Sequence, residues 1–121
     1  VSGKELFEIL ALQIRTNGSP DALARRQRRI RTLALAMEDA NLRAMLTEAQ
    51  DKGSKFFAES LALAQEKGLI RPIVDLEALS YLVQSMFLGR ILVDNTENAV
   101  LSDGINEATI TALEKLLNPQ A

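Results

Sequence analysis

The fold is decided by residues 75–93, which read DLEALSYLVQSMFLGRILV. Asp75 is a preferred helix N-cap, so we predict one helix from Asp75 to about Val93. This helix is apolar almost all round, with Leu76, Leu79, Val83, Met86 and Phe87 on one face and Tyr81, Leu88 and Leu92 well away from it. A helix that is apolar on two sides needs two partners. We therefore expect a second copy of the chain to cover one side; the alternative is a central helix wrapped wholly within its own monomer.

The same segment is not expected to cross a membrane. It contains Glu77, Gln84 and Arg90 and is shorter than a comfortable span of about 20 residues. We interpret it as a buried helix.

On the N-terminal side, start and stop signals predict three more helices. The first begins at the capping box Ser2-Gly3-Lys4-Glu5 and ends at Asn17-Gly18, with Gly18 in a left-handed cap. The second begins at Ser19-Pro20, with serine as the N-cap, and runs to about Glu38. A long third helix is capped by Asp39 or Asn41 and ends at Gly68 before Pro72, and Gly53 could kink or split it.

On the C-terminal side, residues 94–101 are expected to form a loop. Ser102 or Asp103 then begins a fifth helix that ends near Asn118-Pro119. Strand-like alternation is not found, so the prediction is an all-α bundle of five to six helices. Its length of 121 residues fits one domain, residues 1–121. Because the chain begins at Val1 rather than at methionine, we expect it to be a fragment or a trimmed chain.

Composition excludes several kinds of chemistry. The chain has no histidine and no cysteine, so it offers neither a Ser-His or Cys-His nucleophile nor an imidazole or thiolate zinc site. Paired carboxylates such as Glu5 and Glu8 lie on polar faces, without a glycine-rich phosphate cradle nearby. We therefore expect no enzymatic activity, no metal and no cofactor.

Small and polar residues on the apolar helix faces have two interpretations. Gln13, Gly53 and Ser60 either permit close helix packing or leave a cavity for a small molecule, in which a few polar groups converge among apolar ones. The side chains that would line such a cavity are Phe7, Leu10, Gln13, Ile14, Met37, Phe56, Phe57, Ser60 and Met86.

Arginines form the densest charge run, Arg25, Arg26, Arg28, Arg29 and Arg31. The run is interpreted as a solvated helix face, the alternative being a patch that contacts nucleic-acid phosphates. Arg26 alone of the five falls among apolar residues of its helix, and Arg90 does so on the fourth helix. Each either clamps an acidic group of a ligand or forms an internal ion pair.

The order of motifs along the chain resembles the C-terminal half of TetR/AcrR-family transcriptional regulators. The resemblance rests on AQEKGLIRP at residues 64–72, DLEAL at 75–79 and MFLG at 86–89, with DANLR at 39–43 as a matching helix restart. It covers nearly the whole chain in the order and length of the helices. It implies a ligand-binding and dimerisation domain whose last two helices, here 75–93 and 103–118, pair with a second subunit as a four-helix bundle. The expected interface residues are Tyr81, Ser85, Leu88, Leu92, Ile105, Ile110, Leu113 and Leu117.

The resemblance also implies a function. The chain would be the regulatory domain of a cytoplasmic bacterial one-component regulator, a repressor, that homodimerises and binds a small, largely apolar effector. Family members carry an N-terminal helix-turn-helix domain that binds operator DNA, and this sequence lacks it, so DNA is expected as a partner only through that missing domain. The alternatives are a helical interaction module without a ligand, a helical enzyme, and direct nucleic-acid binding through the arginine run.

Overall fold

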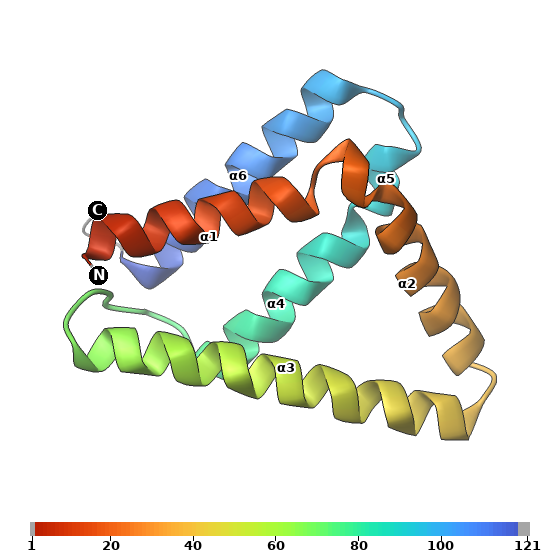
Figure 1. Ribbon diagram of the computed structural model, residues 1–121, viewed down its shortest axis with the longest axis horizontal. Coiled ribbons are helices and arrows are strands. Elements are labelled where there is room, and N and C mark those ends of the chain that lie inside the picture. Colours follow the sequence, from red (N-terminus) through yellow and green to blue (C-terminus); the bar gives the residue numbers. More distant parts are fainter. Residues whose placement is uncertain (1, 119–121) are drawn as a thin grey trace.

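The computed structural model describes residues 2–118, and these form helices joined by short connections without a strand (Figure 1). The all-α prediction is therefore confirmed. The elements are α1 Gly3–Asn17, the single 3-10 turn η1 Pro20–Ala22, α2 Leu23–Ala36, α3 Ala40–Glu66, α4 Leu76–Gly89, α5 Ile91–Asp94 and α6 Ala99–Leu117. Pro119, predicted near the end of the last helix, lies outside the described residues.

Most predicted helix signals are found where the sequence places them. The Ser2 side chain accepts a hydrogen bond from the Glu5 backbone N–H, and Glu5 accepts one from the Ser2 backbone in return. The carboxylate of Asp39 caps α3 and that of Asp75 caps α4. Gly68 lies just beyond the end of α3 with φ of 75°, a left-handed conformation that glycine adopts without strain.

The connection between α1 and α2 differs from the prediction. Gly18 has φ of −93° and is not left-handed, and the Ser19 hydroxyl donates to the Thr16 carbonyl instead of capping α2. Glycine is needed at position 18 for another reason: a Cβ there would lie 2.0 Å from Oδ1 of Asn106 in α6. The close approach of these two segments, rather than a helix stop, therefore accounts for Gly18.

Three further helix boundaries also differ. Gly53 does not interrupt α3, which continues through it. The fourth predicted helix is broken after Gly89, so its last residues form the short α5. The last helix starts at Ala99 rather than at Ser102 or Asp103, because the side chain of Asn98 accepts a hydrogen bond from the Leu101 backbone and caps it.

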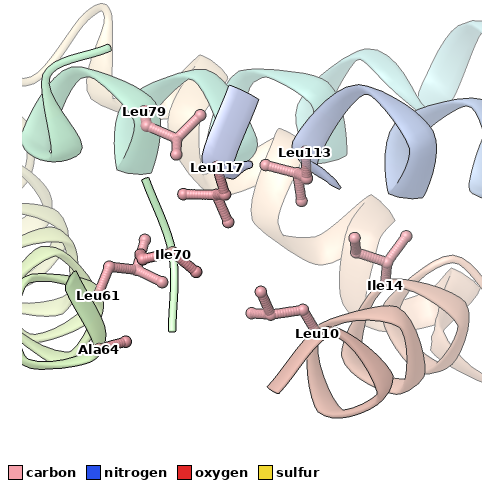
Figure 2. Close-up of a cluster of buried hydrophobic side chains, with 8 residues drawn as sticks. All are labelled: Leu10, Ile14, Leu61, Ala64, Ile70, Leu79, Leu113 and Leu117. Atoms are coloured by element: carbon pink, nitrogen blue, oxygen red, sulfur yellow. The ribbon is translucent and has the colours of Figure 1, made fainter. Parts of the chain in front are cut away.

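The helices surround a small apolar core. In Figure 1, α1 passes in front of α6, α3 runs along the opposite edge, and α4 crosses diagonally between them. Figure 2 shows that side chains from α1, α3, α4 and α6 meet there. The buried cluster consists of Leu10, Ile14, Leu61, Ala64, Ile70, Leu79, Leu113 and Leu117. The segment before α4 is tied to the end of α6, since the backbone N–H of Arg71 donates to the Leu117 carbonyl at 2.8 Å.

By length and composition alone, residues Leu76–Asp94 could cross a membrane, with a mean hydropathy of 1.3. In the structure this stretch is broken at Gly89. Polar side chains within it bond to other parts of the bundle, Gln84 to α2 and α3 and Asp94 to α2. These contacts are those of a bundle helix, and α4 packs mainly against α3.

Candidate functional site

A cavity of about 490 Å³ lies between α1, α2, α3, α4 and α6, and we call it the central cavity. Its volume falls within the range of small-molecule sites, about 300–1,000 Å³. Most of its lining is apolar. The lining residues are Leu10, Gln13, Ile14, Asn17, Arg29, Thr32, Leu33, Leu46, Ala49, Gln50, Gly53, Ser54, Phe57, Ser80, Val83, Gln84, Phe87 and Leu113.

A chain of hydrogen bonds crosses one wall of the central cavity. Nη2 of Arg29 in α2 donates to Oε1 of Gln84 in α4 at 2.7 Å, and Nε2 of Gln84 donates to the Ser54 hydroxyl of α3. The Ser80 hydroxyl donates to the Ser54 carbonyl at 3.1 Å. Ser54 and Ser80 are buried, so these few polar groups are fixed within an otherwise apolar wall.

The space itself is left by small residues in α3. Gly53 has no atom within 4 Å of the position that a Cβ would occupy, and Ala49 lies one turn before it. Opposite them, α1 contributes Leu10 and Ile14, which also belong to the buried core. The cavity therefore lies between core residues of α1 and a stretch of α3 in which Ala49 and Gly53 leave space.

The structure brings four of the predicted ligand-contacting residues to the central cavity: Leu10, Gln13, Ile14 and Phe57. Phe7 packs against the core and lines a different hollow, between α1 and α6. Met86 is half-buried but does not line the cavity. Met37 and Phe56 are 76% and 73% exposed, and Ser60 is exposed with its hydroxyl donating to the Phe56 carbonyl.

These misplacements on α3 have one cause. Its apolar residues fill more than one face, so periodicity alone does not say which face turns inward. The inward face carries Gln50 and Ser54 together with Gly53 and Phe57, while Met45, Phe56 and Leu63 are exposed. On α3, polar residues therefore lie on the buried face and apolar residues on the exposed face. This is the reverse of the pattern that normally identifies the core-facing side of a helix.

Arg26 is not free to clamp a ligand. Its Nη2 lies 2.7 Å from Oδ1 of Asp94, and the two side chains are 9% and 7% exposed. Its Nη1 donates to the carbonyls of Asn17 and Ser19. The internal ion pair, which was the alternative interpretation of Arg26, is therefore what the structure contains.

Arg90 is likewise used inside the fold. It is 3% exposed, and its Nη2 donates to the Gly18 carbonyl at 2.9 Å and to the Ser102 hydroxyl at 2.7 Å. Its Nε has no hydrogen-bond partner within the described part of the chain. The pKa of Arg90 is lowered, first by burial and second by the nearby charge of Arg26. The two arginines and Asp94 thus hold the α1–η1 turn against α5 and α6.

Beside the central cavity lies a smaller pocket of about 200 Å³, which we call the arginine pocket. It is lined by Asn17, Arg25, Arg26, Arg29, Phe87 and Leu88. Arg29 was grouped with the solvated arginines in the sequence, but it is half-buried and lines both the pocket and the cavity. Arg25, Arg28 and Arg31 are exposed, as that interpretation expects, although Arg25 also lines the pocket.

The predicted interface residues divide into two groups. Leu113 and Leu117 are buried in the core of the chain itself and Ile110 packs against it, so these three are occupied within the monomer. Ile105 and Leu88 are half-buried, and the Tyr81 hydroxyl donates to Oδ1 of Asp51 in α3. Ser85 is exposed and Leu92 is 74% exposed.

A row of exposed small and aliphatic residues runs along the outside of α4 and α6, and we call it the outer seam. It consists of Ala78, Leu82, Ser85 and Gly89 of α4, Leu92 of α5, and Leu101, Gly104, Ala108 and Thr111 of α6. On each helix these positions recur at intervals of three and four residues, which places them on one face. Leu82, Gly89 and Gly104 were not among the predicted interface residues; on α6 the prediction included Leu113 and Leu117, which face the core.

Two pKa shifts have local causes in side-chain hydrogen bonds. The bond to Asp51 raises the pKa of Tyr81, and burial adds to the effect. The paired bonds from Arg15 in α1, at 2.8 and 3.0 Å, lower the pKa of Glu107 in α6. Neither group lines the central cavity. Within residues 2–118, no cluster of three or more carboxylates could hold a metal ion.

Sequence reasoning missed Gln84 and Ser80, although their positions on α4 form a pattern that could have identified them. Both lie on the same side of α4 as Val83 and Phe87, which were assigned to the apolar face. Polar residues four positions apart on a core-facing side predict either a mutual partner or a cavity.

Comparison with known proteins adds no assignment: no protein-family model, no curated protein and no solved structure matches this chain.

Proposed function

We propose that this chain is the effector-binding and dimerisation domain of a bacterial transcriptional regulator of the TetR/AcrR type, acting as a repressor in the cytoplasm. The observation that carries the proposal is the central cavity, a largely apolar space of about 490 Å³ into which the Arg29–Gln84–Ser54 chain projects a few polar groups. Such a combination is what a small-molecule site requires. A ligand-free interaction module does not require an apolar cavity of this size with polar groups fixed in its wall.

The outer seam supports the second half of the proposal. α4 and α6 run in opposite directions, since the segment before α4 bonds to the end of α6 and α5 connects their other ends, and both helices contribute side chains to the same buried core. Two copies could therefore place their seams together as a four-helix bundle. Gly89 and Gly104 have open space at their Cβ positions, which permits close helix approach.

A ligand in the cavity would couple effector binding to dimerisation. α4 both lines the cavity and carries the seam, while α1 and α2 line its other walls. An effector that binds one arrangement of α1 and α2 against α4 more tightly than another shifts the population towards it. DNA contacts would belong to a helix-turn-helix domain outside this sequence. The orientation of that domain would follow the orientation of α1. The gene sequence upstream of Val1 tests this part directly.

Ligand binding is tested with the uncharged fluorescent probe N-phenyl-naphthylamine and the purified chain. We expect saturable binding that Gly53→Phe abolishes, because a phenyl group at position 53 projects into the cavity. Glu59→Phe, on the exposed side of the same helix, is the matched control and should bind the probe normally. If the unmodified chain shows no saturable binding, the sensor proposal is wrong and the ligand-free interaction module replaces it.

A further inference from the structure

The central cavity and the arginine pocket adjoin one another and together form a site with two different ends. They share Asn17, Arg29 and Phe87. On one side of these residues the lining is mostly apolar, and on the other it contains two further arginines, Arg25 and Arg26. We propose that the effector is an amphiphilic anion, whose apolar body fills the central cavity and whose anionic group binds Arg29 and Arg25. This inference rests on the proposed function, because it names the chemical class of the effector.

The charges of the residues around the combined site do not balance. Among residues 2–118, those lining the cavity and the pocket include no carboxylate, and Arg29 is the only charged one that lines the cavity. Arg26 is compensated by Asp94. Arg25 and Arg29 form no ion pair with any other described residue. The site therefore carries uncompensated positive charge at one end.

Arg25 and Arg29 donate hydrogen bonds to neutral side chains instead. Nη2 of Arg25 donates to Oδ1 of Asn17 at 3.1 Å, and Nη2 of Arg29 donates to Oε1 of Gln84 at 2.7 Å. Both acceptors are neutral amides. Gln84 is itself bonded to Ser54, so the wall holds the Arg29 side chain between α2 and α4 at the border between cavity and pocket.

The guanidinium of Arg29 at this border favours one class of ligand over others. A half-buried guanidinium keeps several N–H donors, and a carboxylate, sulfate or phosphate accepts two of them at once. An ammonium group would be repelled by Arg25, Arg26 and Arg29. Phe87 and Leu88 are half-buried and line the same pocket, and a charge-assisted bond is stronger where the surroundings are less polar than water. An anion with an apolar tail satisfies both ends, whereas an uncharged hydrocarbon leaves the arginines without a counter-charge.

The test compares three ligands with the same tail by isothermal titration calorimetry at neutral pH, below their micelle-forming concentrations: decanoate, decan-1-ol and decylammonium. We expect decanoate to bind about tenfold or more tightly than decan-1-ol, as one charge-assisted bond predicts. Decylammonium should bind most weakly. In Arg29→Gln, the preference for decanoate over decan-1-ol should be lost.

Two variants make the result specific. Arg31→Gln removes an exposed arginine of the same helix and should leave the preference intact, whereas Gly53→Phe should abolish binding of all three ligands. Equal affinity for decanoate and decan-1-ol, or a preference that survives Arg29→Gln, would overturn the anion inference while leaving the cavity as a sensor site. Failure of all three ligands and of the uncharged probe to bind would overturn the proposed function as well.

Discussion

Arg26 and Asp94 are 68 residues apart in the sequence, yet their side chains form a bidentate ion pair, with Nε–Oδ2 and Nη2–Oδ1 distances of 3.1 and 2.7 Å. The pair joins α2 to α5, and the same guanidinium also holds the carbonyls of Asn17 and Ser19. One arginine therefore fixes the turn after α1, the start of α2 and the end of the α4–α5 segment. These are the elements around the arginine pocket.

Breaking this pair should destabilise the fold strongly. Removing one partner of a buried ion pair leaves a charge without compensation and costs about 3–5 kcal/mol. Asp94→Ala should cost more than Arg26→Met, because Arg26 and Arg90 would then repel each other without a carboxylate, whereas Asp94 still attracts Arg90 when Arg26 is lost. Urea unfolding measures both free energies.

The double variant provides the control. If the pair acts as a unit, Arg26→Met with Asp94→Ala should cost clearly less than the sum of the single variants. Arg28→Gln, on the exposed side of α2, should change the free energy of unfolding by less than about 0.5 kcal/mol. Additive single effects would mean that the two side chains act independently.

Two glycines should respond in opposite directions to alanine. Gly18→Ala places a methyl group against Asn106 and should destabilise the fold by about 1–3 kcal/mol, as overpacking does. Gly53→Ala meets open space in the middle of α3 and should stabilise it by about 0.5–1 kcal/mol. Thermal unfolding compares them, and Asn106→Ala should relieve most of the cost of Gly18→Ala. A Gly18→Ala variant as stable as the unmodified chain would contradict the close approach of these segments.

Much of the fold could be predicted from the sequence because the signals involved are local. Ser2, Asp39 and Asp75 cap their helices through side chains that bond within three residues, so the relevant atoms are adjacent in the chain. Gly18 could not be understood in that way. Its explanation is Asn106, which is 88 residues away.

The site was harder to predict for the same reason. Leu10 and Ile14 were assigned correctly to the cavity because an apolar residue facing the core of α1 also faces whatever space the core leaves. Arg29 was assigned to solvent, because its position in a run of arginines says nothing about Gln84, which is 55 residues further along. Met37 and Phe56 were assigned to the cavity by hydrophobicity, yet they are exposed. Which face of a helix turns inward depends on partners that periodicity does not identify.

Tyr81 should titrate above the ordinary range of a phenol. It donates a hydrogen bond to Asp51, and this bond and partial burial raise its pKa. Because the pKa is raised in the folded chain, the stabilisation is present below the ordinary phenol pKa and is lost as the pH rises through the folded value. The chain has one tyrosine and no tryptophan, so an ultraviolet absorbance titration reports Tyr81 alone.

Asp51→Asn separates the cause from general burial. The variant keeps an acceptor but removes the negative charge, so the pKa of Tyr81 should move back towards the ordinary value, which the urea-unfolded chain supplies as a reference. Glu77 also raises this pKa, by a smaller amount, so Glu77→Gln should have a weaker effect in the same direction. An unchanged titration in Asp51→Asn would show that burial alone is responsible.

A charge placed in the outer seam should separate the two copies of the proposed dimer. Leu82 is 43% exposed in the middle of the α4 part of the seam, and a carboxylate there would be buried without a partner in a four-helix bundle. Leu82→Glu should therefore raise the dimer dissociation constant by at least about tenfold, or about 1.4 kcal/mol. Sedimentation equilibrium measures the constant over a range of concentrations.

The control is a charge on an equally apolar but different surface. Met45 is 69% exposed on α3 and lies outside the seam, so Met45→Glu should leave the dissociation constant unchanged. Gly104→Ala adds one methyl group to α6 where helices would approach closely, and it should weaken dimerisation without reducing the free energy of unfolding of the monomer. If the unmodified chain stays monomeric at high concentration, the exposed leucines of α4 and α5 need a different partner. If Met45→Glu rather than Leu82→Glu dissociates the dimer, the two copies meet through α3 and the outer seam is not the interface.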